Sequence, residues 1–134
     1  GALRALPEGL SKMFVHAYQS YIFNKSLSRY IEEDLIVERL PLVGFESRPD
    51  ELTEKILAEE KVSAEDFRVK GFSQLSSKGE LRDCFELMQD FKLDEIGKDE
   101  LNGGANKVSL TFSLRPGVYA TTLLREYMKN EYWL

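Results

Sequence analysis

The apolar positions of residues 10–31 recur with the period of an α-helix. The segment reads LSKMFVHAYQSYIFNKSLSRYI, and neither glycine nor proline interrupts it. At about 100° per residue, one face of the predicted helix collects Leu10, Met13, Phe14, Ala17, Tyr21 and Ile31. Further apolar residues, among them Ile22 and Phe23, fall on other faces. A helix that is apolar nearly all round is covered on more than one side, and we expect this of residues 10–31.

Polar residues also lie within this predicted helix. They are His16, Gln19, Ser20 and Asn24. Buried polar side chains bond mostly to backbone, so we expect those that are buried to hold neighbouring segments rather than a ligand.

The middle of the chain predicts shorter elements. The stretch LIVERLPLVGF (35–45) is cut by Pro41 and Gly44, which is typical of a loop or an edge strand. Proline and acidic residues in the first turn favour a surface helix over 49–60. The sequence SAED (63–66) resembles a capping box and predicts another short helix.

The C-terminal part changes to a period of two. Apolar residues alternate with serine and threonine after the turn cluster NGGAN (102–106), which predicts an antiparallel hairpin over 83–114. Pro116 and Gly117 fit the central positions of a type II turn, and a helix over 118–130 follows. The pattern as a whole predicts an α+β fold.

Composition narrows the class of protein. The chain has 134 residues, 43% hydrophobic and 31% charged, which is typical of one folded domain or parts of two. No apolar run approaches the ~18 residues of a membrane-spanning helix. We expect no signal peptide, because the first residues show no basic start followed by an apolar block. The first residue is Gly1 instead of methionine, which is compatible with a fragment. Cys84 is the single cysteine, which favours a small buried side chain in a reducing cytoplasm.

The net charge of −5 is unevenly distributed. Residues 1–40 are neutral, residues 41–104 carry −7, and residues 105–134 carry +2. A protein that binds nucleic acid by itself usually has a basic face, and none is indicated here. Any affinity for RNA would need local basic groups, or basic surface outside this chain.

The residue types argue against most catalytic centres. His16 is the only histidine, it lies mid-helix, and no serine lies in a Gly-x-Ser-x-Gly turn. One histidine and one cysteine nearly exclude a zinc site, and a glycine-rich phosphate loop is missing. Acidic pairs are common, but none lies in an apolar setting that would shift its pKa. Composition and spacing therefore indicate no catalytic centre.

Two longer motifs are more specific. HAYQSYIFNKSLSRYI (16–31) resembles the pattern HAxQSxxFNxxLSxR of the TruD family of RNA pseudouridine synthases, with Arg29 one place early. FSLRPGVYATTLLRE (112–126) resembles the family's C-terminal pattern FxLPPGSYATxxLRE, with departures at Arg115 and Val118. LPLVGFE and SSKGELR, between these motifs, also resemble segments of the archaeal branch. The likeness is collinear and covers essentially the whole chain.

The resemblance implies a fold and a reaction. Residues 1–104 would belong to the insertion domain peculiar to TruD, and residues 105–134 to the mixed sheet and helices of the catalytic domain. The family isomerises uridine to pseudouridine, chiefly in tRNA, with an essential Asp and without metal or organic cofactor. That Asp lies in an upstream Gly-x-Lys-Asp motif, which is missing here; the nearest match, Gly97-Lys98-Asp99, lacks one residue. The chain therefore resembles the C-terminal portion of the enzyme, and we expect it to be inactive without the N-terminal portion.

The resemblance also singles out residues for RNA. It implies that Tyr119 stacks on the target base, which such enzymes must flip out of the RNA; without it, core packing would be favoured. Candidates for phosphate contacts are Lys25, Arg29, Lys78, Arg82 and Arg115, although for any one of them a solubilising charge is the simpler interpretation. Two other functions stay open: a non-catalytic RNA-binding module derived from this fold, and a protein-interaction domain, which the acidic segment 41–104 favours over the former.

Overall fold

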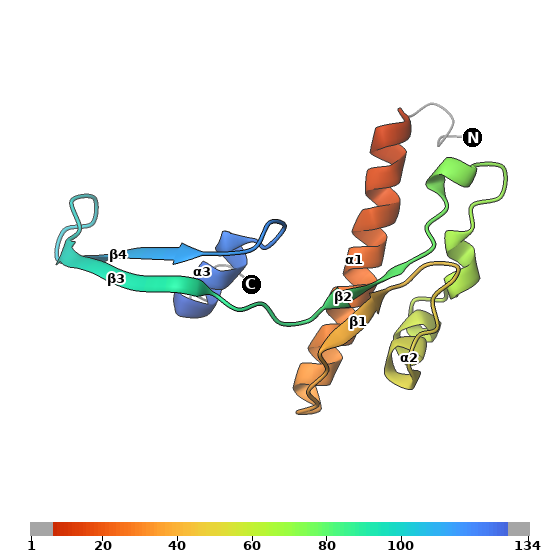
Figure 1. Ribbon diagram of the computed structural model, residues 1–134, viewed down its shortest axis with the longest axis horizontal. Coiled ribbons are helices and arrows are strands. Elements are labelled where there is room, and N and C mark those ends of the chain that lie inside the picture. Colours follow the sequence, from red (N-terminus) through yellow and green to blue (C-terminus); the bar gives the residue numbers. More distant parts are fainter. Residues whose placement is uncertain (1–6, 129–134) are drawn as a thin grey trace. The chain divides into compact units, whose positions relative to one another are not determined.

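The protein, described by a computed structural model over residues 7–128, divides into two compact units. The first unit ends at Phe85 and the second begins at Glu86. Each contains a two-stranded antiparallel sheet and at least one helix, so the predicted α+β class is confirmed (Figure 1). The assignment of residues 1–104 and 105–134 to two domains of an enzyme stays a prediction. No helix within residues 7–128 is long and apolar enough to cross a membrane.

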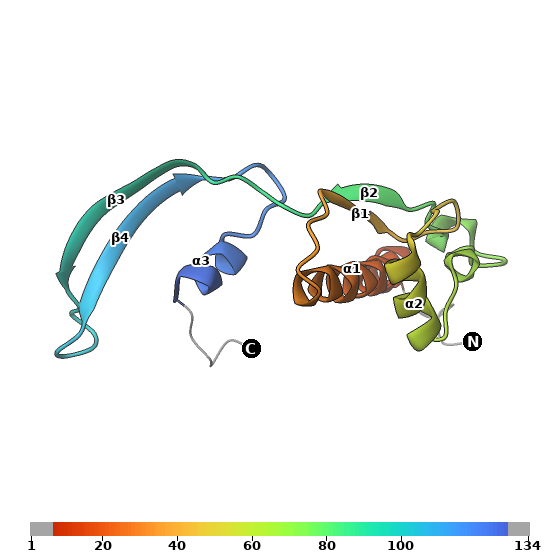
Figure 2. The ribbon, with the colours of Figure 1, turned by 90° about the horizontal axis from the view of Figure 1, so that it is seen from below.

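The first unit is built on α1 (Glu8–Glu32), which confirms the long helix expected over 10–31. Strands β1 (Arg39–Leu42) and β2 (Glu80–Asp83) pair antiparallel, and α2 (Glu51–Glu59) packs beside α1. Figures 1 and 2 show this small sheet lying across α1. The 3-10 helices Ala64–Phe67 and Ser73–Leu75 lie between α2 and β2 in the chain. The core consists of Ile22, Val43, Ile56, Leu57 and Phe67.

The buried side of α1 differs from the one that its apolar pattern indicates. Its buried residues are Ser11, Gln19, Ile22, Phe23 and Ser26. The predicted apolar face is exposed instead, with Met13 at 55% and Phe14 at 53% of full exposure. Within the first unit the helix is covered on one side only, which differs from the expected cover on more than one side. That side packs on β1 and α2.

The helix expected over 49–60 is confirmed as α2, and Asp50 is its N-cap. The Asp50 carboxylate accepts hydrogen bonds from the backbone amides of Leu52 and Thr53, both at 3.0 Å. It also accepts from the hydroxyl groups of Thr53 and Tyr30, both at 2.9 Å. The tyrosine contact ties the start of α2 to α1. The capping box between Ser63 and Asp66 is confirmed as well.

Asp50→Ala is expected to lower the free energy of unfolding by about 1–2 kcal/mol, because the cap is lost. Burial acts to raise the pKa of Asp50, but hydrogen bonds from Thr53 and Tyr30 outweigh it and hold that pKa below its usual value. The contribution is therefore complete above the unfolded-state pKa of about 3.9 and is lost as pH falls through the lower folded-state pKa. Urea unfolding over a pH series measures this. The exposed Glu54→Ala serves as control, and a cost of Asp50→Ala that stays constant on acidification would contradict the cap.

A close approach of backbone joins β1 to the segment before β2. The Phe45 amide donates to the Ser77 carbonyl at 2.9 Å, and the Glu46 amide donates to the Lys78 carbonyl at 3.0 Å. Gly79 has a φ of +84°. A Cβ atom on Gly79 would lie 2.6 Å from the backbone nitrogen of Gly44, so a side chain does not fit there.

The second unit consists of the hairpin β3 (Gln89–Lys98) and β4 (Asn106–Ser113), followed by α3 (Ala120–Met128). The hairpin expected over 83–114 is confirmed, but its first strand begins only at Gln89. Asp83 pairs with Arg39 of β1 instead. Two register irregularities interrupt the pairing, and Figure 2 shows a curved ribbon with α3 on its concave side. The expected end of the last helix at residue 130 lies outside the described residues.

The second unit has no buried residue among those that the structure describes. The rings of Phe91 and Tyr127 stack at 6.0 Å and join the hairpin to α3. Large apolar side chains nevertheless remain exposed, including Leu93, Ile96 and Met128. An isolated two-stranded hairpin is only marginally stable in water. The unit therefore needs apolar cover from elsewhere to form a core.

Candidate nucleic-acid interface

Tyr119 stands between a tight turn and α3. The Val118 amide donates to the Arg115 carbonyl at 3.2 Å, and Gly117 has a φ of +92°, as the predicted type II turn requires. The Tyr119 carbonyl accepts from the Thr122 amide at 3.1 Å, so the backbone of Tyr119 begins the helix. Its side chain is 70% exposed and has no ring or hydrogen-bond partner among the described residues. A fixed backbone thus presents an open aromatic ring.

Arg115 is engaged within the same unit. Its Nε lies 2.7 Å from Oε1 of Glu86, and its Nη2 lies 2.5 Å from Oε2 of the same carboxylate. This paired hydrogen bond lowers the pKa of Glu86 below its usual value. An RNA phosphate at Arg115 would have to compete with Glu86. The pair joins residues 29 positions apart, and nothing in the local sequence indicates it.

Gln19 of the α1 motif holds two segments together. It is 5% exposed, and its Nε2 donates to the Val43 carbonyl at 2.7 Å and to the Ser77 hydroxyl at 2.8 Å. The expectation that the buried polar residues of this helix bond to nearby segments is confirmed for Gln19. The motif residues His16 and Asn24 are exposed instead.

The predicted phosphate contacts of the first unit do not form one cluster. The Lys78 ammonium group lies 3.3 Å from a Glu46 carboxylate oxygen, and the Arg82 guanidinium lies 5.6 Å from the centre of the Phe23 ring. Arg82 therefore lies against α1, whereas Lys78 pairs with the segment that follows β1. Arg29 turns toward α2 instead, at 3.7 Å from Glu59.

Lys25 lies between α1 and the end of α2. Its ammonium group lies 2.7 Å from a Glu60 oxygen and 3.0 Å from a Glu59 oxygen. Hydrogen bonds to both carboxylates raise the pKa of Lys25. Lys25 therefore joins α1 to α2, and a phosphate would have to displace two carboxylates.

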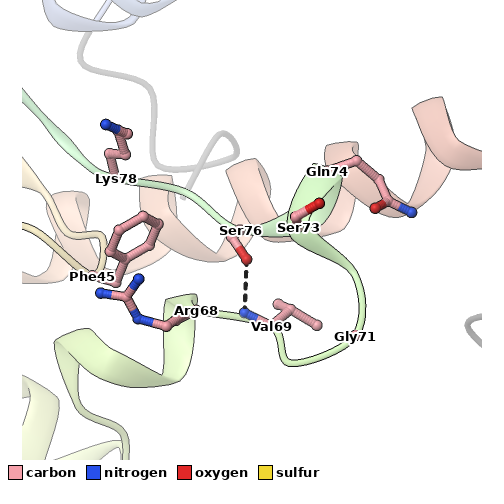
Figure 3. Close-up of a pocket in the computed structure, with 8 residues that line it drawn as sticks. All are labelled: Phe45, Arg68, Val69, Gly71, Ser73, Gln74, Ser76 and Lys78. Carbon is pink, nitrogen blue, oxygen red and sulfur yellow. Dashed lines mark hydrogen bonds between the residues drawn. The ribbon is translucent and has the colours of Figure 1, made fainter.

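A pocket of about 590 Å³ opens beside the 3-10 helices (Figure 3). Its lining includes Phe45, Arg68, Ser73, Gln74, Ser76 and Lys78. The Arg68 guanidinium lies over the Phe45 ring at 3.9 Å and pairs with Glu65 at 2.6 Å. The Ser76 hydroxyl accepts from the Val69 amide at 3.0 Å. Most of its polar groups thus already have partners within the protein.

The described residues contain no group of side chains that could hold a metal ion. Asp99, the nearest match to the family's catalytic Asp, lies at the tip of the β3–β4 hairpin. Its carboxylate accepts from the Asn102 side chain and from the Leu101 amide, both at 2.8 Å. These bonds lower its pKa, so Asp99 stabilises the turn as an ionised cap.

Comparisons with known proteins agree on one family. The family profile described as tRNA pseudouridine synthase D (TruD) matches residues 1–43 and 36–127. A tRNA pseudouridine synthase D of Methanosarcina acetivorans is 38% identical over 96% of this chain and 40% of its own length. A relative of the same description from Methanopyrus kandleri is 36% identical over 97% of this chain and 35% of its own length.

A solved structure has a similar fold. The crystal structure of a tRNA pseudouridine synthase D from Methanosarcina mazei matches with a TM-score of 0.79 and 34% identity. The match covers 95% of this chain and 40% of that structure. The chain therefore spans about two fifths of the length of the proteins it matches.

Proposed function

This chain belongs to the TruD family, and we propose that it is the C-terminal portion of an enzyme that isomerises uridine to pseudouridine in tRNA. One observation carries the proposal: a match over 96% of the chain to 40% of a protein described as a tRNA pseudouridine synthase D. The TM-score of 0.79 supports the same assignment at the level of the fold.

The proposal divides the reaction between two portions. The N-terminal portion supplies the essential Asp, because the family's motif for it is missing here, and the reaction needs no cofactor. Residues 105–134 belong to the mixed sheet and helices of the catalytic domain, and residues 1–104 to the insertion domain. The apolar residues left exposed on β3, β4 and α3 support this, because the missing portion would cover them.

Tyr119 holds the target base in this proposal. Isomerisation breaks the bond between the uracil N1 and the ribose C1′ and forms a bond from C5 to the same carbon. The freed base must stay in the site while it rotates to bring C5 to the ribose. An aromatic side chain on a rigid turn stacks on the base without bonding to its edge, which leaves the edge free to rotate.

The tRNA backbone is proposed to contact Arg82. It would also contact Lys78, Arg29 and Arg115 once RNA displaces their carboxylate partners. A second candidate function, a protein-interaction domain, is favoured by the exposed apolar face of α1 and by the net charge of −7 over residues 41–104.

Binding of tRNA across a salt series separates the two candidate functions. The chain joined to its N-terminal portion is expected to bind tRNA with an affinity that falls steeply with salt, because phosphate contacts release counterions. Filter binding measures this. Lys78→Ala is expected to reduce the slope of log affinity against log salt concentration by about 0.7 to 0.9. Lys70→Ala, which also removes an exposed charge, is the matched control. An affinity for tRNA too weak to measure would favour the protein-interaction domain.

A further inference from the structure

We propose that a second pocket of the first unit holds a nucleotide of the RNA other than the uridine that reacts. This pocket, here the His16 pocket, measures about 390 Å³ and lies between α1 and the ends of β1 and β2. Its lining includes His16, Gln19, Ser20, Leu42, Lys78 and Glu80. The inference rests on the proposed function, since it takes RNA as the ligand.

Gln19 gives the pocket a fixed hydrogen-bond acceptor. Its Nε2 donates to the Val43 carbonyl, which can only accept, so a reversed amide would place two acceptor oxygens against each other there. No donor among the described residues reaches its Oε1. The residue as a whole is 5% exposed, but the buried side-chain atoms without a partner among the described residues are Ser11 Oγ and Ser26 Oγ, so Oε1 of Gln19 is open to the pocket. A ligand with an N–H group would satisfy it.

The remaining lining groups add an apolar wall and charges at the mouth. Leu42 is half-buried and offers a surface for a flat ring. The Lys78 ammonium group is exposed beside Glu46 and can reach an anion. His16 is exposed and has no hydrogen bond or ion pair among the described residues.

A ribonucleotide meets these demands together. Its base has an N–H group for Gln19 and an apolar face for Leu42, and its phosphate suits the Lys78 ammonium group. The volume lies within the range of about 300–1,000 Å³ that is usual for small-molecule sites. Tyr119 belongs to the other unit, so the base proposed to stack on it contacts different elements of the fold. The His16 pocket would therefore select a second nucleotide of the tRNA besides the target uridine.

Variants at the mouth of the pocket test this in the full-length enzyme. Lys78→Ala removes the proposed contact with the phosphate and is expected to raise the Kd for tRNA by about tenfold, the scale of one hydrogen bond to a charged group. Ser20→Phe fills the pocket without touching the bonds of Gln19 and is expected to act in the same direction. Thermal unfolding shows whether either variant perturbs the fold.

Abasic substitutions, placed one at a time along the RNA, identify the nucleotide. At one position other than the target, removal of the base should weaken binding to the wild type but not weaken binding to Ser20→Phe any further. Lys70→Ala removes an exposed charge outside the pocket. Its effect on tRNA affinity should therefore be additive with that of every abasic substitution. Additive effects with Ser20→Phe at all positions, or non-additivity only at the target uridine, would overturn the inference. Since the readout is affinity, failure to isomerise uridine would count against the proposed function alone.

Discussion

Tyr119→Ala in the full-length enzyme is expected to lower kcat/KM on tRNA by about 5- to 150-fold, which corresponds to about 1–3 kcal/mol of lost base stacking. The ring is 70% exposed and has no partner among the described residues, so the truncation should not disturb the packing of this chain. Single-turnover kinetics and RNA affinity separate the loss of base stacking from a loss of general RNA binding.

Tyr119→Phe is the matched control. It keeps the ring and removes only a hydroxyl group that has no hydrogen-bond partner among the described residues. It is expected to retain most of the activity. If Tyr119→Ala left turnover and affinity unchanged, the ring would not contact the base.

Gly79→Ala is expected to be among the most destabilising single substitutions in the first unit. Gly71 provides a matched comparison, because its φ is +79° against +84° for Gly79, yet nothing lies within 4 Å of its added Cβ. Gly71→Ala should therefore lower the free energy of unfolding only by the strain of the left-handed conformation, about 1–2 kcal/mol. Gly79→Ala adds contacts of 2.2 Å to the Ser47 hydroxyl and 2.6 Å to the Gly44 nitrogen.

This clash should add about 1–3 kcal/mol to the cost at Gly79, the usual range for forcing extra atoms into a packed site. Urea unfolding of this chain with each substitution measures the difference. Equal costs at the two glycines would mean that the backbone beside Gly44 relaxes freely.

Local signals were sufficient where a few adjacent residues determine the structure. Asp50 caps α2, Asp66 forms a capping box with Ser63, and Gly117 makes the turn before Tyr119. Each of these features depends on contacts between residues at most three positions apart. Contacts between distant segments were not predictable in this way. The pairing of Arg39 with Asp83 removes Asp83 from the predicted hairpin, and only the folded chain shows it.

The buried side of α1 illustrates the same limit. Apolar residues lie nearly all round the helix, so its period alone does not say which side packs within this chain. Burial follows β1 and α2, and it includes the polar Gln19 because Val43 and Ser77 accept its hydrogen bonds. Met13 and Phe14 lie on the exposed side. Exposed apolar residues are expected in a chain that spans 40% of a relative's length, because other parts of the longer protein can cover them.

For the site, sequence reasoning placed Tyr119 on a rigid turn, and the structure has that turn. It could not find the two hydrogen bonds that hold Nε2 of Gln19, because Val43 and Ser77 are 24 and 58 residues away in sequence. Nor could it find the carboxylate partner of Arg115. Each depends on a tertiary contact.

Tritium release from tRNA labelled at C5 of uridine tests the division of the enzyme most directly, because carbon 5 loses its hydrogen when it joins the ribose. The 134-residue chain, the N-terminal portion and the two joined in one polypeptide are compared at equal concentrations. Release is expected only when both portions are present. Release by the 134-residue chain alone would show that it contains its own nucleophile and would contradict its assignment as the C-terminal portion of the enzyme.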